Sequence, residues 1–462
     1  MTKVPRVVIA GTNSGCGKTS ITCAILRAMH DSYDAPVPCA LKCGPDYIDP
    51  MFHSEVTGVK SANLDSFFFD DETLKYLLAQ NSQNCGIAVI EGVMGFYDGM
   101  GFNGTAGSCH EISRITKSPV ILVIDAKGMS QSLLAVTDGF LNLHKPNNIC
   151  GLILNRCGTN SYRSFKSMIE SRYRGRILPL GHMPELKGAE IKSRHLGLVT
   201  AAEIEDLNAR LDLLAENAKK YIDIDRIINI ADAAPDLDIN PKFTFPRLKA
   251  ENGFKDGCCR IAVASDRAFC FYYYDSLDAL ANLGAELVFF SPLDDEKLPD
   301  DTDGLYLGGG YPELYASELS KNEKMRTAVR EAVRGGMPCI AECGGFMYLT
   351  DSIDGFPMAG AIEGKSKKKS LLTRFGYLRL CADKDNMLCK KGEGIAAHEF
   401  HYYDSDNSGG DFTALKANRK NYKAAFAGGS LYAGYPHFHF YSNPDFAVNF
   451  VRACAAYRNN RK

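Results

Sequence analysis

The stretch GTNSGCGKT, residues 11–19, has the composition of a phosphate-binding loop. It follows the apolar run VVIA and opens a segment with a helical pattern. In such a strand–loop–helix unit, backbone N–H groups and the helix N-terminus bind phosphate oxygens, a lysine adds a mobile charge, and a threonine hydroxyl binds magnesium. The residues predicted to bind the phosphates of a nucleotide are Gly11, Thr12, Asn13, Ser14, Gly15, Gly17, Lys18 and Thr19.

The spacing of this loop differs from the usual phosphate-loop pattern, in which four residues precede the Gly-Lys-Ser/Thr end. Here five residues separate Gly11 from Gly17. This variant resembles the loop of the dethiobiotin synthetase group, whose members activate carboxylates with ATP. The resemblance implies that the loop serves ligase chemistry.

Carboxylates in two further stretches are candidates for a metal site. LKCGPDYIDP contains Asp46 and Asp49 in a predicted turn, and VIEGVMGFYDG places Glu91 at the C-terminal end of a predicted strand. Ligands of parallel sheets bind at this end. Carboxylates beside a polyanion site require a cation between them, so we expect Mg²⁺ at Thr19, Asp46 and Glu91. The alternative is that Asp46 and Asp49 only cap turns.

A second chemical centre is predicted around Cys343. CIAECGGFMYL places this cysteine between an apolar strand and a helical segment. A strand–turn–helix elbow holds its central residue at a strained angle and requires small neighbours, which Ala341, Gly344 and Gly345 provide. The helix N-terminus stabilises a thiolate, so Cys343 is a candidate nucleophile.

A cysteine nucleophile also needs a base and an oxyanion hole. LYLGGGYPELYA offers the backbone N–H groups of Gly309 and Gly310, and Gly344 can supply another. AGYPHFHFYSNP, late in the chain, offers His437 and His439 as bases. Taken together these features predict a type 1 glutamine amidotransferase, whereas Cys343 alone could be a structural cysteine.

Two sets of predicted elements must position these residues. Short β-branched strands such as RVVIAG and PVILVID alternate with amphipathic helices in the first half, and a similar series begins at CRIAVASD. This alternation predicts an α/β protein with two doubly wound domains. The predicted parts are an ATP-binding synthetase domain at 1–231, a linker rich in Asp and Pro at 232–257, and a glutamine amidotransferase domain at 258–462.

Composition excludes several classes of protein. Apolar residues make up 45% of the 462 residues, charged residues 23%, and the net charge is −2, so no nucleic-acid or membrane bias is present. The chain starts without a secretory signal pattern, and we expect a cytoplasmic protein. Its 16 cysteines include no Cys-x-x-Cys pair, which argues against a zinc or iron–sulfur site. The basic run GKSKKKS is interpreted as a solvated loop.

The order of the motifs adds a family resemblance. GTNSGCGKT, GPDYIDP, IEGVMGFYDG, SRHLGL, AFCFYY, GGGYPE, ECGGFMYL, HEFHY and PHFHF, within roughly residues 5–445, are similar to the cobyrinic acid a,c-diamide synthases of cobalamin biosynthesis. The resemblance implies a dethiobiotin-synthetase-like domain fused to a class I glutamine amidotransferase domain. Such ligases activate two tetrapyrrole carboxylates as acyl phosphates with ATP and Mg²⁺, and ammonia from glutamine then forms the amides.

The resemblance also implies roles for particular residues. Cys343 is the nucleophile and His437, in YPHFHF, is the base, with His439 in reserve. Relatives with a full triad have a glutamate two residues after the catalytic histidine, where this chain has His439, so a Cys–His dyad is expected. Because several substrate carboxylates would be repelled by bare aspartates, we assign Asp46 and Glu91 to the metal. The residues assigned to the tetrapyrrole are Tyr47, Ile48, Asp49, Asp98, Arg194 and His195.

Alternatives remain at the level of sequence. The same chemistry could act on sirohydrochlorin, on its nickel form, or on hydrogenobyrinic acid. A nucleotide-switch protein would need no glutaminase domain, and a free-standing glutaminase would leave Lys18 and Glu91 without a purpose. The expected partners are the tetrapyrrole, ATP and L-glutamine, without nucleic acid or membrane, and the oligomeric state is open, with a homodimer among the choices.

Overall fold

The structure is a computed structural model that divides into two compact units, Met1–Phe243 and Thr244–Lys462. It describes residues 2–32, 34–101, 104–189, 206–240, 254–417 and 420–461, together with the backbone of two short strands at 193–194 and 197–198. No described helix has the length and apolarity needed to cross a membrane.

The division between the units falls inside the predicted linker, residues 232–257. The first residues of that segment pack on the first unit, because Leu237 exchanges backbone hydrogen bonds of 2.9 Å with Thr2. The guanidinium of the buried Arg6 also donates to the carbonyl of Pro235 over 2.7 Å. Residues 241–253 lie outside the described part of the chain.

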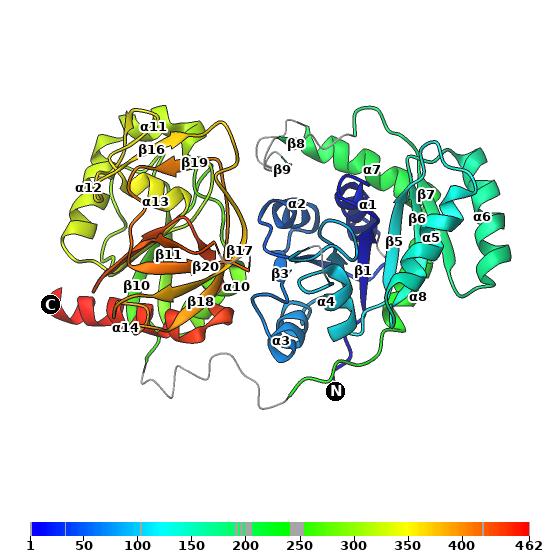
Figure 1. The fold of residues 1–462 in the computed structure, drawn as a ribbon, viewed down its shortest axis with the longest axis horizontal. Helices are drawn as coiled ribbons and strands as arrows, with labels where there is room; N and C mark the ends of the chain where they lie inside the picture. Colours follow the sequence, from blue (N-terminus) through cyan, green and yellow to red (C-terminus); the bar gives the residue numbers. More distant parts are fainter. Residues whose placement is uncertain are drawn as a thin grey trace. The chain divides into compact units, whose positions relative to one another are not determined.

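The first unit contains a seven-stranded parallel sheet in the order β3-β2-β4-β1-β5-β6-β7 (Figure 1). Strand β2 lies on one side of the central strand β1 and β5 on the other, and all strands are parallel, so the loops at their C-terminal ends lie at one edge of the sheet. The loops after β1, β2 and β4 therefore meet. The strands are β1 Arg6–Gly11, β2 Pro38–Cys43, β3 Ala62–Leu64, β4 Ile87–Glu91, β5 Val120–Asp125, β6 Ile149–Asn155 and β7 Leu178–Met183.

The strands of this sheet are nearly continuous apolar runs because both faces are covered, and every residue of β1 and β4 is buried. Two-residue strands, β8 Ser193–Arg194 and β9 Gly197–Leu198, form a separate antiparallel ribbon. The helices of the unit are α1 Lys18–His30, α2 Ile48–Thr57, α3 Asp71–Asn81, α4 Cys109–Ile115, α5 Ser132–Leu143, α6 Thr159–Tyr173, α7 Leu207–Tyr221 and α8 Ile224–Asp232.

The second unit is built on a six-stranded sheet in the order β11-β10-β12-β13-β23-β22, parallel except for β22. The neighbouring strands β12, β13 and β23 are parallel, so the loops at their C-terminal ends come together. The strands are β10 Cys259–Ala264, β11 Ala285–Phe290, β12 Gly304–Leu307, β13 Cys339–Glu342, β22 Phe426–Ala427 and β23 Leu431–Gly434.

This sheet separates two hydrophobic cores. Consecutive side chains of a strand point to opposite faces. Accordingly, Ile261 and Val263 of β10 belong to one core, whereas Ala262 and Ala264 belong to the other. The helices of the unit are α10 Tyr274–Asn282, α11 Ala316–Lys321, α12 Glu323–Arg334, α13 Gly344–Leu349 and α14 Pro444–Arg461, with 3-10 turns η2 Pro312–Tyr315 and η3 Phe440–Ser442.

Two further sheets of the second unit were not indicated by the strand–helix alternation of the sequence. A five-stranded antiparallel sheet has the order β21-β20-β17-β18-β24, and a four-stranded sheet has the order β15-β14-β16-β19. Their strands are β14 Ser352–Ile353, β15 Phe356–Pro357, β16 Lys365–Lys368, β17 Arg374–Ala382, β18 Gly394–His401, β19 Tyr403–Ser405, β20 Phe412–Leu415, β21 Tyr422–Ala424 and β24 His437–Phe438. The basic run GKSKKKS, interpreted from its sequence as a loop, therefore includes strand β16.

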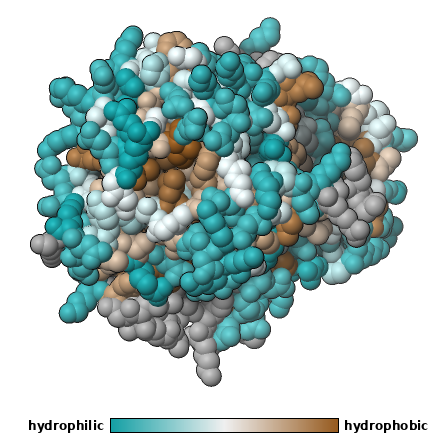
Figure 2. All heavy atoms as spheres, turned by 60° about the vertical axis from the view of Figure 1, so that its left-hand side comes forward, coloured by the Kyte–Doolittle hydropathy of each residue, from teal (hydrophilic) through white to brown (hydrophobic). Residues whose placement is uncertain are grey.

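The face drawn in Figure 2 is covered mostly by hydrophilic residues, with hydrophobic residues in small groups. Exposed hydrophobic side chains of this kind are normal for a folded protein. The more informative side chains are polar and buried, and several of them lie at the two sites described next.

Candidate functional site

The loop between β1 and α1 leaves no room for side chains at two of its glycines. A Cβ on Gly11 would lie 2.4 Å from Cys16 Sγ, and one on Gly17 would lie 2.0 Å from Asn155 Nδ2. Gly17 also has φ of +94°, which favours glycine. Asn155, at the end of β6, donates from Nδ2 to the Cys16 carbonyl over 2.9 Å. No pattern in the sequence pointed to Asn155, which supports the loop from a distant strand.

Lys18 folds back over the same loop. Its Nζ donates to the carbonyl of Asn13 over 3.0 Å, and its side chain is buried. Asn13, Ser14 and Gly15 are exposed, so their backbone can be approached by a ligand. The arrangement of loop backbone, ammonium group and helix N-terminus can bind phosphate oxygens.

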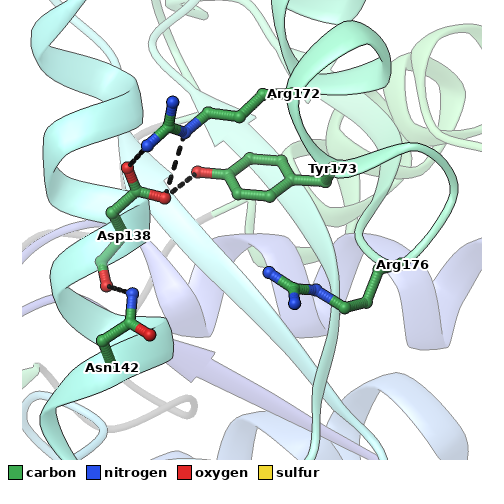
Figure 3. Close-up of a pocket in the computed structure, with 5 residues that line it drawn as sticks. All are labelled: Asp138, Asn142, Arg172, Tyr173 and Arg176. Atoms are coloured by element: carbon green, nitrogen blue, oxygen red, sulfur yellow. Dashed lines mark hydrogen bonds and ion pairs between the residues drawn. The ribbon is translucent and has the colours of Figure 1, made fainter.

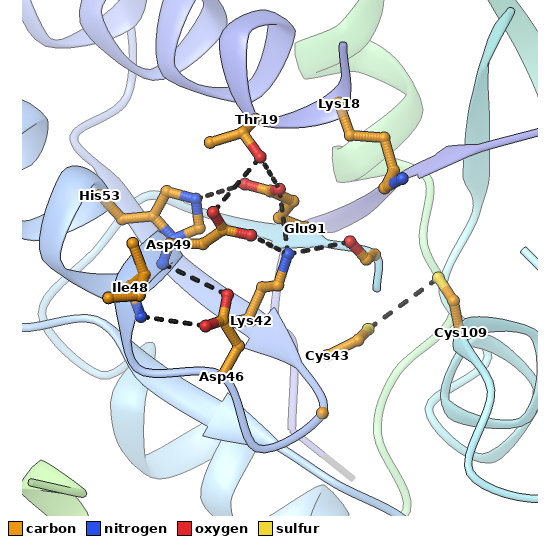
Figure 4. A network of polar contacts seen from close by, with 12 residues as sticks. Lys18, Thr19, Lys42, Cys43, Asp46, Ile48, Asp49, His53, Glu91 and Cys109 are labelled. Atoms are coloured by element: carbon orange, nitrogen blue, oxygen red, sulfur yellow. Dashed lines mark hydrogen bonds and ion pairs between the residues drawn. The ribbon is translucent and has the colours of Figure 1, made fainter. Parts of the chain in front are cut away.

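Three oxygen-bearing side chains converge next to this loop (Figure 4). Thr19, in the first turn of α1, donates to Glu91 Oε1 over 2.6 Å and lies 3.4 Å from Asp49 Oδ1. Glu91 ends β4, and Asp49 lies in the first turn of α2. Hydroxyl and carboxylate oxygens are the ligands that Mg²⁺ prefers.

Lys42 was not selected from the sequence, yet it joins these carboxylates. Its Nζ forms an ion pair with Asp49, lies 3.0 Å from Glu91 Oε1 and donates to the Gly92 carbonyl over 3.1 Å. Burial alone would lower the pKa of Lys42, but Asp49 and Glu91 raise it well above its ordinary value. A lysine in the otherwise apolar strand PCALKC was the available signal.

His53 is a second residue that sequence reasoning missed. Its Nε2 lies 2.6 Å from Glu91 Oε2, and its Nδ1 lies 3.3 Å from Ser61 Oγ. Burial alone would raise the pKa of Glu91, but Lys42 and His53 outweigh burial and hold it below its ordinary value. The available signal was the spacing of four residues from Asp49 to His53, which share one side of α2.

Asp46 has a local role in the structure. Its carboxylate accepts the backbone N–H groups of Ile48 over 3.0 Å and Asp49 over 3.3 Å, at the start of α2. Asp49, not Asp46, lies beside Thr19 and Glu91, whereas the sequence assigned Asp46 to the metal and Asp49 to the substrate. The division of roles between the two aspartates stays a prediction, and the geometry favours Asp49 for the metal.

The other residues assigned to the substrate are dispersed. Tyr47 and Ile48 are buried, at 8% and 7% exposure, beside Asp49. Asp98 is exposed, and its Oδ2 accepts the N–H of Gly95 over 2.9 Å. Arg194 is described only by its backbone, in strand β8, and His195 lies outside the described residues.

The second site is a turn between β13 and α13. Cys343 follows β13 directly and has φ of +48°, a strained value for a residue with a side chain. Its N–H donates to the Gly434 carbonyl over 2.8 Å. A Cβ on Gly345 would lie 2.1 Å from the Leu307 carbonyl oxygen, so the small residue predicted there is required. This geometry is that of a nucleophile elbow.

His437, in β24, makes the hydrogen-bond contact with Cys343 and is 3% exposed. Burial would lower the pKa of His437, but Cys343 and Glu342 outweigh burial and raise it to about 10. His439 lies elsewhere: its Nδ1 accepts the Tyr441 N–H over 3.2 Å, and its Nε2 is 4.0 Å from Asp275.

The predicted oxyanion glycines adjoin these two residues. A Cβ on Gly309 would lie 2.4 Å from His437 Cε1, and one on Gly344 would lie 3.1 Å from the backbone nitrogen of Gly310. The three glycines and the Cys343–His437 pair therefore lie at one place, where a base, a thiol and backbone donors can act on one carbonyl group.

A separate shallow pocket lies between α5 and α6 (Figure 3). Asp138 forms an ion pair with Arg172 and accepts the Tyr173 hydroxyl over 2.9 Å. The Asp138 carboxylate is thus paired within the pocket. The pocket shares no residue with the phosphate-loop site or with the cysteine site. Its lining residues are Asp138, Asn142, Arg172, Tyr173 and Arg176.

Two known domains match the two units of the chain. Residues 7–199 match the CobQ/CobB/MinD/ParA nucleotide binding domain, and residues 260–445 match the CobB/CobQ-like glutamine amidotransferase domain. The chain is therefore an α/β protein in which a phosphate-loop domain that binds a nucleotide is fused to a glutamine amidotransferase domain.

Full-length relatives define the family. A cobyrinate a,c-diamide synthase of Thermoplasma volcanium is 40% identical over 100% of this chain and 99% of its own. Proteins of the same name from Dehalococcoides mccartyi and Listeria innocua are 39% and 38% identical, over 97% and 95% of this chain and 98% and 97% of their own. The chain belongs to the cobyrinate a,c-diamide synthase family and is a glutamine-dependent carbon–nitrogen ligase.

Proposed function

We propose that this protein uses ATP and glutamine to convert the a and c side-chain carboxylates of cobyrinic acid to amides, a reaction of cobalamin biosynthesis. The observation that supports this proposal is the presence of two sites on one chain. A phosphate loop beside an oxygen cluster can activate a carboxylate. A cysteine elbow with a histidine can release ammonia from glutamine.

In the glutaminase step, Cys343 passes its thiol proton to His437, and Sγ attacks the side-chain amide carbon of glutamine. His437 then donates that proton to the nitrogen as ammonia leaves, and a thioester remains on the cysteine. Backbone N–H groups of Gly309, Gly310 and Gly344 stabilise the negative oxygen of the tetrahedral intermediate. Water then hydrolyses the thioester to glutamate and restores the thiol.

In the synthetase step, Lys18 and the loop backbone hold the phosphates of ATP. A substrate carboxylate oxygen attacks the terminal phosphorus, ADP leaves, and an acyl phosphate forms. Ammonia then attacks the acyl carbon and phosphate departs, which gives the amide. Repeating the cycle on the second carboxylate gives the diamide.

We further propose Mg²⁺ as the cofactor of this step. Mg²⁺ is usually bound through one or two carboxylates together with phosphates and water, and the Thr19, Asp49 and Glu91 oxygens beside the phosphate loop are ligands of this kind. Thr19, Glu91 and one of the two aspartates would hold it, and the ion would neutralise charge that develops on the phosphates.

The tetrapyrrole is assigned to Tyr47, Ile48, Asp49 and Asp98, with Arg194 and His195 as further contacts. Tyr47 and Ile48 start the helix that carries Asp49, so they can seat a ring whose carboxylate faces the ATP site. Tyr47→Ala or Ile48→Ala should change how far the monoamide is carried to the diamide. Chromatographic time courses of both products test this assignment, and unchanged product ratios would contradict it.

Mass spectrometry tests the reaction. Incubation with ATP, Mg²⁺, glutamine and cobyrinic acid should yield two successive exchanges of OH for NH₂. Sirohydrochlorin, its nickel form and hydrogenobyrinic acid are the competing substrates in parallel incubations. A preference for one of them would overturn the choice of cobyrinic acid and keep the chemistry.

The two-site assignment has its own test. Cys343→Ala should lower the rate of glutamine-dependent amidation by several powers of ten. It should leave the rate of amidation from added ammonia unchanged. Loss of both activities in a folded variant would contradict it.

Three further assignments, of the domain boundaries, the cellular compartment and the oligomeric state, complete the proposal. The functional parts are residues 1–231, the linker 232–257 and residues 258–462, and the protein acts in the cytoplasm. A homodimer stays a prediction, which sedimentation analysis of the purified protein tests.

A further inference from the structure

We propose that Glu342 is the acid that positions the base His437, so that the glutaminase site is a triad with an unusual third member. The inference rests on the proposed glutaminase site. Relatives with a full triad carry a glutamate two residues after the histidine, where this chain has His439. Glu342 instead comes from the position directly before the nucleophile.

The contacts of Glu342 are those of a fixed acid. Its Oε2 lies 3.6 Å from His437 Nδ1 as an ion pair, and the carboxylate is 1% exposed. Two neutral donors hold it in place. Oε1 accepts the N–H of Phe438 over 3.3 Å, and Oε2 accepts the hydroxyl of Tyr306 over 3.4 Å.

Backbone geometry explains how two adjacent residues reach one histidine. Successive side chains of a regular strand point to opposite faces. Strand β13 ends at Glu342, and the positive φ of Cys343 breaks the alternation there. Both side chains contact His437 as a result.

The contact specifies the role of each ring nitrogen. A carboxylate accepts but does not donate when ionised, so His437 Nδ1 carries a proton toward Glu342. The other ring nitrogen, Nε2, is then left to exchange a proton with the Cys343 thiol. A distance of 3.6 Å is longer than a hydrogen bond, as is common before substrate tightens a catalytic site.

Among the residues that the structure describes, the other titratable groups near His437 do not make this contact. The ring of His398 stacks on that of His437, with 5.2 Å between the ring centroids. Burial, and to a smaller extent the nearby His437, lowers the pKa of His398 well below its ordinary value. Glu399 is within electrostatic range, but its carboxylate accepts the Tyr422 hydroxyl. Burial lowers the pKa of His401 to about 3, so it is neutral at pH 7.

The test replaces Glu342 in the full-length enzyme and measures glutamate release from glutamine. Glu342→Gln should lower kcat about 10- to 100-fold with little change in KM, because orientation of a general acid–base is lost and substrate contacts are kept. The alkaline limb of the rate–pH profile should move to lower pH, since the imidazolium loses its carboxylate. A purely structural role for Glu342 would not move that limb.

Controls separate this inference from the proposed function. Ammonia-dependent amidation should keep the wild-type rate in Glu342→Gln, because the synthetase site belongs to the first unit and Glu342 to the second. Asp275→Asn removes the acid next to the other histidine and should leave the rate–pH profile unchanged. Glu342→Asp should retain more activity than Glu342→Gln because the negative charge is kept.

Two results would overturn the inference. One is a Glu342→Gln enzyme with the wild-type kcat and pH profile, while Cys343→Ala remains inactive with glutamine. The other is a Glu342→Asp enzyme that is less active than Glu342→Gln. If Cys343→Ala instead keeps its glutamine-dependent activity, the proposed function itself fails.

Discussion

Lys42 offers the sharpest test of how the ATP site is stabilised. Its side chain is 3% exposed, and its ammonium group is shared by two carboxylates, those of Asp49 and Glu91 (Figure 4). Lys42→Met keeps most of the volume of the side chain and removes the charge. The two carboxylates are then left close together without their buried cation.

The expected loss of stability follows from that burial. Removing one member of a buried ion pair typically costs about 3–5 kcal/mol. For a unit of this size, each kcal/mol lowers the Tm by about 2–4 °C, so the first unit should melt roughly 6–20 °C lower. Mg²⁺ with ATP should recover part of the loss, because a divalent cation can replace the missing charge.

Thermal and urea unfolding of Lys42→Met, with and without Mg²⁺ and ATP, measure these changes. Lys127→Met is the matched control, because Lys127 pairs with Glu185 where both side chains are 59% exposed and should change stability by less than about 1 kcal/mol. Adding Asp49→Asn to Lys42→Met should recover about 1–3 kcal/mol, since one unpaired carboxylate is removed. A Tm of Lys42→Met within the range of the Lys127→Met control, in the absence of Mg²⁺, would refute the reasoning.

Three further predictions concern the phosphate loop, the acid stability and the aspartates. Lys18→Ala should impair amidation from glutamine and from ammonia equally, by a few kcal/mol in the transition state, and a normal ammonia-dependent rate would contradict the loop assignment. Burial lowers the pKa of His401 and His439 to about 3 in the folded protein. When the pH falls below about 6.5, the ordinary pKa of histidine, these side chains are protonated in the unfolded chain but not in the folded protein. The free energy of unfolding should therefore fall by up to about 1.4 kcal/mol per pH unit for each histidine. Urea unfolding between pH 7.5 and 4.5, as compared with His401→Gln, measures this slope, and equal slopes would count against it. Asp49→Asn should raise the Mg²⁺ concentration needed for half-maximal rate more than Asp46→Asn does, and magnesium titrations giving the opposite order would restore Asp46 as the metal residue.

The parts of the fold that the sequence predicted are those with a strong local signal. Buried parallel strands such as β1 and β4 appear as apolar runs, and glycine-rich turns mark their ends. Strand β17 carries a weaker signal, because exposed and buried residues alternate over only part of its length and it contains Gly376. Its partners β18 and β20 are set by long-range pairing, which one segment read alone does not reveal.

The same distinction applies to the sites. Cys343 was identifiable because an elbow requires small residues at fixed neighbouring positions, and the loop at Gly11–Thr19 because its backbone must approach phosphate. Lys42 and His53 were missed because their significance depends on Glu91, which comes from another strand. Residue spacing along a chain does not show which charges a parallel sheet brings together.

The charge arrangement around Glu91 explains why such partners are needed. This carboxylate is fully buried, and burying an acid without a partner is costly. Its two oxygens are divided: Oε2 faces His53, while Oε1 is shared by the Thr19 hydroxyl and the Lys42 ammonium. The side chain is therefore held in one orientation before any nucleotide arrives. The Thr19 hydroxyl and the carboxylates of Asp49 and Glu91 can therefore bind a cation without first reorganising. Oxygen ligands that are preorganised in this way can act together with the phosphates on a substrate carboxylate.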